Sequence, residues 1–226
     1  MVIQENRAAK AVIPAVLYAV IFISVVKLRP LILHDLNVSL AVLIGAYCLL
    51  GGAGIYLFRE NFRKGISEWK EHFTKSLLWL IGGYIAGIIL ETMAYYPRYL
   101  LYPDYEGMND SNISIAAKLL PVPLFIVAAG ILGPIAEETF FRFILVDKLR
   151  KKIPAFICVI LSSALFMAWH MHALTLPELL ENLPKFISGL VFSVIMLRSE
   201  NPTIPVLLHV FGNTIAITAQ YMNGAA

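Results

Sequence analysis

The sequence predicts an all-α protein, a polytopic transmembrane helical bundle with about seven spans, and two observations lead to this prediction. Of the 226 residues, 59% are apolar, whereas a soluble globular domain has about 45–50%, and the mean hydropathy is +0.75. The apolar residues gather in several long runs, which is typical of an integral membrane protein. No Ser/Gly-rich linker divides the chain, so we expect a single membrane domain over residues 1–226.

Seven apolar segments are candidate spans, for which about 20 residues are needed, and the sixth of them is shorter than that. The first follows Arg7 and Lys10 and has no prompt small-residue cleavage site, so we interpret it as a retained helix rather than a signal peptide. The fourth is long and contains three prolines, which predicts a tilted, kinked or broken helix. The expected spans are residues 9–28, 36–58, 76–95, 116–146, 154–173, 185–198 and 202–222.

The charges between the spans predict the orientation of the protein. Most of the 18 Lys and Arg residues fall in segments that share one side, and the positive-inside rule places that side and the N-terminus in the cytoplasm, with the protein in the cell membrane. Because the basic residues mark topology, we expect no nucleic-acid partner. The inner segment 60–75 has apolar residues at helical spacing, which indicates an amphipathic helix at the membrane surface, with a solvated loop as the alternative. Segment 96–115 is expected to be an external loop.

Three charged side chains interrupt the fourth span within "GPIAEETFFRF", residues 133–143. A charge near the bilayer centre costs about 2.5–3.5 kcal/mol on insertion scales, so each needs a partner or a function. Glu138 and Arg142 are four residues apart on one helical face, which predicts an ion pair. Glu137 points about 100° away from Glu138 and is therefore the candidate for a chemical role.

Two further segments place polar side chains in apolar surroundings. His170 follows Phe166 by one helical turn, and His209 and Asn213 share one face of the last span. Taken alone, each is more typical of a hydrogen-bonded packing residue. Measured from the predicted cytoplasmic ends of their spans at residues 146, 154 and 202, Glu137, His170 and His209 lie roughly 14, 24 and 10 Å deep at 1.5 Å per residue. These depths predict a site within the bilayer, but they differ by about 14 Å.

These side chains have the chemistry of a hydrolase that activates water. A carboxylate in a low-dielectric site can act as a general base. Histidine and asparagine side chains can donate hydrogen bonds to a carbonyl oxygen as it gains charge. No GxSxG motif occurs and no cysteine accompanies these residues, so a serine or cysteine nucleophile is unsupported. The combination favours hydrolysis of a peptide bond by an activated water.

The same three segments resemble the signature motifs of the CPBP family of membrane proteins, also called the Abi family. This family includes CAAX prenyl endopeptidases of the Ras-converting-enzyme type and bacteriocin-processing or immunity proteins. The resemblance covers about residues 117–222, which we expect to form the catalytic core. The chain departs from the family at Phe143, where a glycine often follows the arginine. The motif EExxxR is matched by Glu137, Glu138 and Arg142, FxxxH by Phe166 and His170, and HxxxN by His209 and Asn213.

The resemblance implies an intramembrane glutamate endopeptidase that acts on a membrane-associated protein or peptide, such as a prenylated CAAX protein or a leader peptide, and needs no cofactor. It also implies how the work is divided among the residues. The implied catalytic residues are Glu137 as the base, His170 to position the water, and His209 with Asn213 to stabilise the oxyanion. The implied supporting residues are Glu138, Arg142 and Phe166.

Three alternatives remain open from the sequence. A zinc metalloprotease would use Glu137, His170 and His209 as ligands, since zinc accepts these ligand types, although no HExxH motif occurs. A non-catalytic immunity or regulatory membrane protein would keep the motifs as structure and bind a partner. A transporter is less favoured, because no repeat of broken spans is evident.

Overall fold

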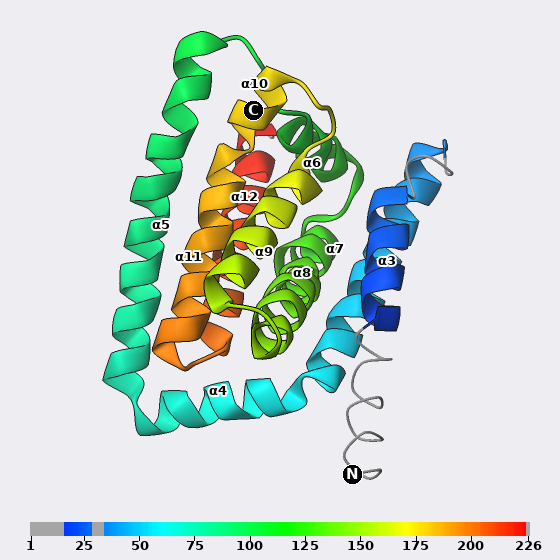
Figure 1. The fold of residues 1–226 in the computed structure, drawn as a ribbon. Coiled ribbons are helices and arrows are strands. Elements are labelled where there is room, and N and C mark those ends of the chain that lie inside the picture. The colour runs from blue at the N-terminus through cyan, green and yellow to red at the C-terminus, as the bar shows by residue number, and fades with distance from the viewer. Residues whose placement is uncertain (1–15, 29–33, 225–226) are drawn as a thin grey trace.

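The computed structural model describes residues 16–28 and 34–224, and within these ranges every regular element is a helix (Figure 1). The all-α prediction is confirmed. After a first helix over residues 16–23, the elements are η1 (Ser24–Leu28), α3 (Leu36–Leu57), α4 (Arg59–Glu71), α5 (Phe73–Leu101), α6 (Met108–Leu119), α7 (Val122–Phe125), η2 (Ile126–Leu132), α8 (Gly133–Glu138), η3 (Thr139–Lys148), η4 (Leu149–Lys151), α9 (Ala155–His170), α10 (Leu176–Glu181), α11 (Leu183–Ser199) and α12 (Thr203–Gly224).

Each expected span corresponds to an apolar helix, and the protein is an integral membrane protein. Two shorter apolar helices, Val16–Val26 and Ala155–His170, coincide with the first and fifth expected spans. Residues 9–15 of the first expected span lie outside the described residues. The helices long and apolar enough to cross a membrane are Leu36–Leu57, Phe73–Leu101, Val122–Lys151, Leu176–Ser199 and Thr203–Met222.

The expected external loop at residues 96–115 and the expected start of the fourth span are both wrong. The third span continues as α5 to Leu101, and a separate helix, α6, begins at Met108. After α6, Leu120 is extended, because the proline that follows it disfavours helical backbone. The fourth span therefore begins at Val122 rather than at residue 116.

The fourth span is irregular, as its prolines predict. It runs without a loop from α7 to η4, and two of its stretches, η2 and η3, are π-helical. Between them lies α8, only six residues long, which carries both glutamates of the first motif. Short π-helical turns inside α-helices are frequent at functional sites, so this irregularity coincides with the part of the span to which the sequence assigns chemistry.

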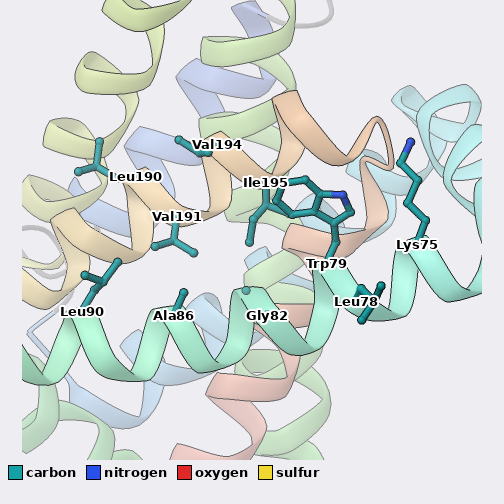
Figure 2. Close-up of a pocket in the computed structure, with 11 residues that line it drawn as sticks. Lys75, Leu78, Trp79, Gly82, Ala86, Leu90, Leu190, Val191, Val194 and Ile195 are labelled. Carbon is teal, nitrogen blue, oxygen red and sulfur yellow. The ribbon is translucent and has the colours of Figure 1, made fainter.

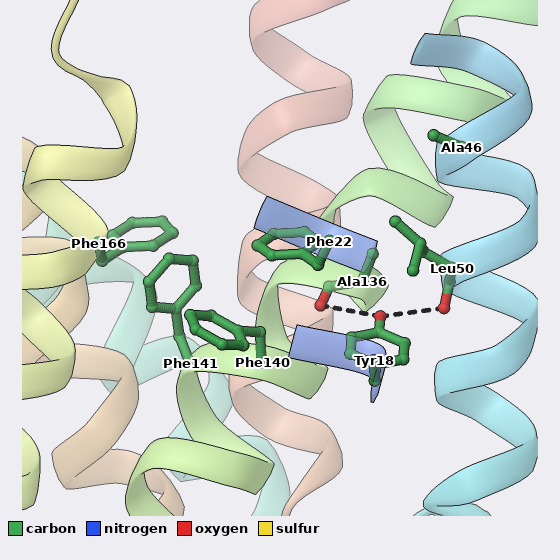
Figure 3. Close-up of a cluster of buried hydrophobic side chains, with 8 residues drawn as sticks. All are labelled: Tyr18, Phe22, Ala46, Leu50, Ala136, Phe140, Phe141 and Phe166. Atoms are coloured by element: carbon green, nitrogen blue, oxygen red, sulfur yellow. Dashed lines mark hydrogen bonds between the residues drawn. The ribbon is translucent and has the colours of Figure 1, made fainter. Parts of the chain in front are cut away.

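Aromatic side chains join the first helix to the helices that carry the motifs (Figure 3). Phe22 stacks on Trp169 of α9, with ring centroids 4.5 Å apart. The Tyr18 hydroxyl lies 3.0 Å from the Leu50 carbonyl oxygen and 3.2 Å from that of Ala136, and it donates to this pair of acceptors. Because Ala136 immediately precedes Glu137, this contact fixes the backbone beside the candidate base.

The amphipathic helix predicted within residues 60–75 is confirmed as α4, which runs across one end of the bundle (Figure 1). Its Trp69 donates from Nε1 to Thr203 Oγ1, 3.1 Å away at the start of α12. Its Phe62 packs against Phe143, with ring centroids 5.7 Å apart. Phe143 is completely buried, so the residue that departs from the family pattern fills the space between the fourth span and α4.

Candidate active site

Glu137 and Glu138 lie next to the two ring nitrogens of one histidine, His209 of α12. Glu138 Oε1 is 2.9 Å from His209 Nδ1, and Glu137 Oε2 is 3.6 Å from His209 Nε2. An ionised carboxylate only accepts hydrogen bonds, so Nδ1 donates to Glu138. Glu138 thereby orients the imidazole so that its Nε2 edge faces Glu137.

The ion pair predicted between Glu138 and Arg142 is present and completely buried. Arg142 Nη1 lies 3.1 Å from Glu138 Oε1, and neither side chain has exposed surface. The guanidinium carbon lies over the rings of Phe166, 4.5 Å from the centroid, and of Phe192, 5.2 Å from the centroid. Aromatic faces attract cations at such distances. Phe166 of the second motif thus contacts the charged group that holds Glu138.

His170, His209 and Asn213 line one cavity of about 230 Å³ formed by α5, α9, α11 and α12. His170 is the last residue of α9, and its Nδ1 lies 2.9 Å from the Phe166 carbonyl oxygen. A proton on Nδ1 satisfies that oxygen and leaves Nε2 as the basic nitrogen of the neutral ring. Asn213 Nδ2 donates to the Ala129 carbonyl oxygen at 3.4 Å. The three motifs therefore meet at one place.

The depths estimated from the sequence separate these residues too far, and the start of α12 explains why. Asn201, which precedes this helix, is completely buried, and its Oδ1 accepts hydrogen bonds from the backbone N–H and the hydroxyl of Thr203. With α4 packed against it, the first turn of α12 lies inside the bundle rather than at its surface. His209 is therefore deeper than its distance from residue 202 suggests, and it reaches Glu137.

Glu91 of α5, and Lys185 and Ser188 of α11, also line the cavity, and the sequence did not predict them as site residues. Ser188 Oγ donates to Glu91 Oε1 at 2.6 Å and so joins the two helices. A signal for Glu91 was available, because it is an acidic residue inside the third expected span, and intramembrane ionisable residues mark functional sites by default. Lys185 lies one turn before Ser188 and is the first residue of the sixth expected span, where a lysine is usual.

A buried carboxylate holds the loop that follows His170. Glu178 Oε1 accepts a hydrogen bond from the backbone N–H of His172 at 3.0 Å, and Glu178 has no exposed surface. Its Oε2 accepts from the Tyr105 hydroxyl at 2.5 Å. This hydrogen bond raises the pKa of Tyr105 to about 12. The hydrogen bonds of Glu178 thereby tie α10 to the loop after α5 and to the end of α9, beside His170.

The zinc alternative would use Glu137, His170 and His209 as its ligands. Within the described part of the chain, no group of three or more His, Cys, Asp or Glu side chains could hold a metal ion. Glu137 and His209 face each other, but His170 does not complete a set of three ligands with them. No step proposed below passes through a metal.

Residues 119–215 match the family described as "Type II CAAX prenyl endopeptidase Rce1-like". The family resemblance is confirmed for this part of the chain. The matched segment contains all three motifs and lies within the residues 117–222 that we expected to form the catalytic core. It also contains α8, α9 and the first half of α12, which place those motifs.

Two curated proteins are similar to the chain. The "Putative membrane peptidase YdiL" of Bacillus subtilis (strain 168) is 26% identical over 162 residues, which are 72% of this chain and 62% of that protein. The "Uncharacterized 24.3 kDa protein" of Escherichia coli is 35% identical over 108 residues, 45% of this chain and 47% of that protein. The chain therefore spans less than two thirds of the length of either relative. No solved structure matches it.

Proposed function

We propose that the protein is an intramembrane endopeptidase that hydrolyses a peptide bond of a membrane-associated protein or peptide with a water activated by Glu137. One observation carries this proposal: the Glu137 carboxylate faces His209 Nε2 at 3.6 Å, and His209 shares a cavity with His170 and Asn213 inside the membrane bundle. The family match and the peptidase name of the Bacillus subtilis relative support it.

The reaction we propose uses Glu137 as a base and then as an acid. Glu137 removes a proton from a water that His170 Nε2 helps to position, and the water oxygen attacks the carbonyl carbon of the substrate. As the carbonyl oxygen becomes negative, His209 Nε2–H and Asn213 Nδ2–H donate hydrogen bonds to it, with His209 acting as an imidazolium that carries a proton on both ring nitrogens. The tetrahedral intermediate then breaks the C–N bond, and Glu137 returns the proton to the departing amine.

Glu138 and Arg142 act in this scheme through His209 rather than on the substrate. Glu138 accepts a hydrogen bond from the Nδ1–H of His209, and Arg142 balances the charge of Glu138 in a place from which water is excluded. Leaving a buried charge without a partner is costly. The pair therefore keeps the imidazole in one orientation while charge moves between Glu137 and the substrate.

Cleavage of a peptide panel by the purified protein in lipid nanodiscs tests the proposal. The panel contains internally quenched peptides with and without a lipid anchor, including CAAX and leader sequences. We expect the wild type to cleave at least one of them, and Glu137→Gln to lower the rate about 10²–10⁴-fold, as loss of a general base does. Glu60→Gln is the matched control, because it makes the same chemical change on an exposed carboxylate of α4.

The same assay separates the alternatives. Cleavage that a zinc chelator abolishes and added zinc restores would overturn the metal-free mechanism. Cleavage that persists in Glu137→Gln would show that Glu137 is not the general base. A folded protein that cleaves no peptide of the panel, yet binds one of them, would instead favour the non-catalytic immunity or regulatory function.

A further inference from the structure

A second cavity, of about 780 Å³, lies between α5 and α11 (Figure 2). We call it the α5–α11 groove. Small residues of α5, including Gly82 and Ala86, form one wall, and Val191 and Val194 of α11 form the other. Among the described residues that line it, only Lys75, at one end, is charged. Apart from Gly83, the lining residues of the groove are not those of the candidate active site.

The dimensions of the groove suit a hydrocarbon chain. Its lining on α5 extends from Lys75 to Leu90, a rise of about 22 Å at 1.5 Å per residue. One leaflet of the hydrocarbon core is about 15 Å thick, half of about 30 Å. The volume lies within the range of about 300–1,000 Å³ found for ligand sites. An extended acyl chain can therefore follow the groove through a whole leaflet.

Cations gather at one end of the groove. Lys75 Nζ lies 3.3 Å from Glu200 Oε2, just beyond the end of α11. Arg198 follows Val194 by four residues, so it lies on the same face of α11, one turn closer to that end. The ion pair of Lys75 is exposed, with 46% and 68% of the two side chains accessible. Exposed pairs contribute little to stability, so Lys75 can exchange Glu200 for a phosphate.

Trp79 stands one turn after Lys75 and also lines the groove (Figure 2). Tryptophan is enriched where headgroups meet hydrocarbon, because its ring is apolar and its N–H is polar. In the orientation predicted from the loop charges, this end of the bundle is cytoplasmic, and anionic lipids are concentrated in the cytoplasmic leaflet. The order along the groove is thus cation, interfacial indole and then apolar walls, which is the order of chemical groups along a phospholipid.

We propose that the α5–α11 groove binds one anionic phospholipid, with its phosphate at Lys75 and Arg198 and an acyl chain along Gly82 and Ala86. The proposal does not depend on peptidase activity. A transmembrane helix of another protein would also be apolar, but its hydrocarbon-spanning part would offer no anion to Lys75 and Arg198, whereas a lipid phosphate would. The charge at the end of the groove therefore favours the lipid.

Quenching of Trp79 by brominated lipids tests the proposal. The protein is reconstituted in phosphatidylcholine vesicles that contain a fixed fraction of either phosphatidylglycerol or phosphatidylcholine with brominated acyl chains. The difference between the wild type and Trp79→Phe isolates the Trp79 signal. Each cation near an anionic lipid surface favours binding about fivefold. We therefore expect brominated phosphatidylglycerol to quench Trp79 at least about fivefold more effectively than brominated phosphatidylcholine.

Matched variants test whether a preference for the anionic lipid arises at the groove. Lys75→Gln combined with Arg198→Gln should reduce the ratio of the two quenching efficiencies to about one, by removal of two cations. Lys152→Gln should leave it unchanged, because Lys152 is exposed and does not line the groove. Gly82→Leu should lower quenching by both lipids. A Cβ at position 82 meets no atom within 4 Å, so the new side chain can occupy the groove without moving a helix.

Three results would overturn the proposal. Equal quenching of wild-type Trp79 by the two lipids would show that the groove does not select an anionic headgroup. Unchanged quenching in Gly82→Leu would show that no acyl chain lies in the groove. Weak quenching by both lipids, together with cross-linking of two copies of the chain, would show that protein rather than lipid covers it. Thermal unfolding of each variant verifies that it is folded.

Discussion

Arg142→Met is expected to lower the free energy of unfolding by about 3–5 kcal/mol, because it removes one partner of a buried ion pair and leaves the charge of Glu138 uncompensated. Neither side chain has exposed surface, so water cannot replace the lost partner. Loss of the contacts between the guanidinium and the rings of Phe166 and Phe192 adds about 0.5–2 kcal/mol. Apolar packing of the methionine side chain offsets part of this loss.

The double variant Glu138→Gln with Arg142→Met is expected to recover most of that loss. It removes both charges, and neutral replacements for a buried ion pair often cost little. The glutamine oxygen can still accept a hydrogen bond from the Nδ1–H of His209. The two substitutions should therefore be strongly non-additive, with a coupling of about 2–3 kcal/mol.

Denaturant titration in mixed micelles, followed by circular dichroism, measures these free energies. Arg150→Met is the control, because its ion pair with Asp147 is partly exposed and should contribute about 0–1 kcal/mol. A loss below about 1 kcal/mol in Arg142→Met would refute the argument that the pair is needed for stability. Additive losses in the double variant would refute the argument from an uncompensated charge.

Three further predictions concern packing and hydrogen bonds. Tyr18→Phe should cost about 0.5–1.5 kcal/mol, since its hydroxyl donates to backbone oxygens of α3 and α8; an unchanged thermal unfolding temperature would contradict this. Gly189→Ala should cost about 1–3 kcal/mol, because its Cβ would lie 2.7 Å from Ser163 Cα and force α9 and α11 apart. Gly82→Ala, which has open space, should stabilise by about 0.5–1 kcal/mol, and denaturant titration should rank the two variants in that order. Asn201→Ala should leave polar groups of Ser76 and Thr203 unpaired and cost about 1–3 kcal/mol, with faster amide exchange in the first turn of α12; exchange confined to other helices would contradict it.

The helices could be predicted from the sequence because the bilayer imposes a minimum length on an apolar run, and the chain meets it repeatedly. The surface helix α4 was predictable because its apolar residues recur at helical spacing between two spans. A break was one of the outcomes predicted for the fourth span, but its position at Leu120 was not, since prolines inside an apolar run are compatible with either a kink or a new helix. Which occurs depends on packing of α6 against its neighbours, and residue types alone do not specify that packing.

The residues of the site could be predicted from the sequence, but most of the contacts between them could not. The spacing of Glu138 and Arg142 is enough to predict their ion pair, because both lie on one helix. The contact of His209 with both glutamates depends on how deep and at what rotation α12 enters the bundle. Those quantities are set by Asn201 and by α4, which are distant in sequence from the glutamates. Glu91 could have been considered from its place inside a span, but its partner Ser188 lies 97 positions away.

The arrangement around His209 offers a physical reason for two consecutive glutamates. Adjacent residues on a helix point about 100° apart, and an imidazole carries its nitrogens at separate positions on the ring, so one histidine can meet both carboxylates. The two carboxylates are not equivalent. Glu138 also contacts Arg142 and has no exposed surface, whereas Glu137 has 5% of its surface exposed and faces the Nε2 edge of His209. A carboxylate already paired with a guanidinium is a poor acceptor for a further proton. The geometry therefore favours Glu137 as the group that exchanges a proton with water and Glu138 as the group that holds the histidine.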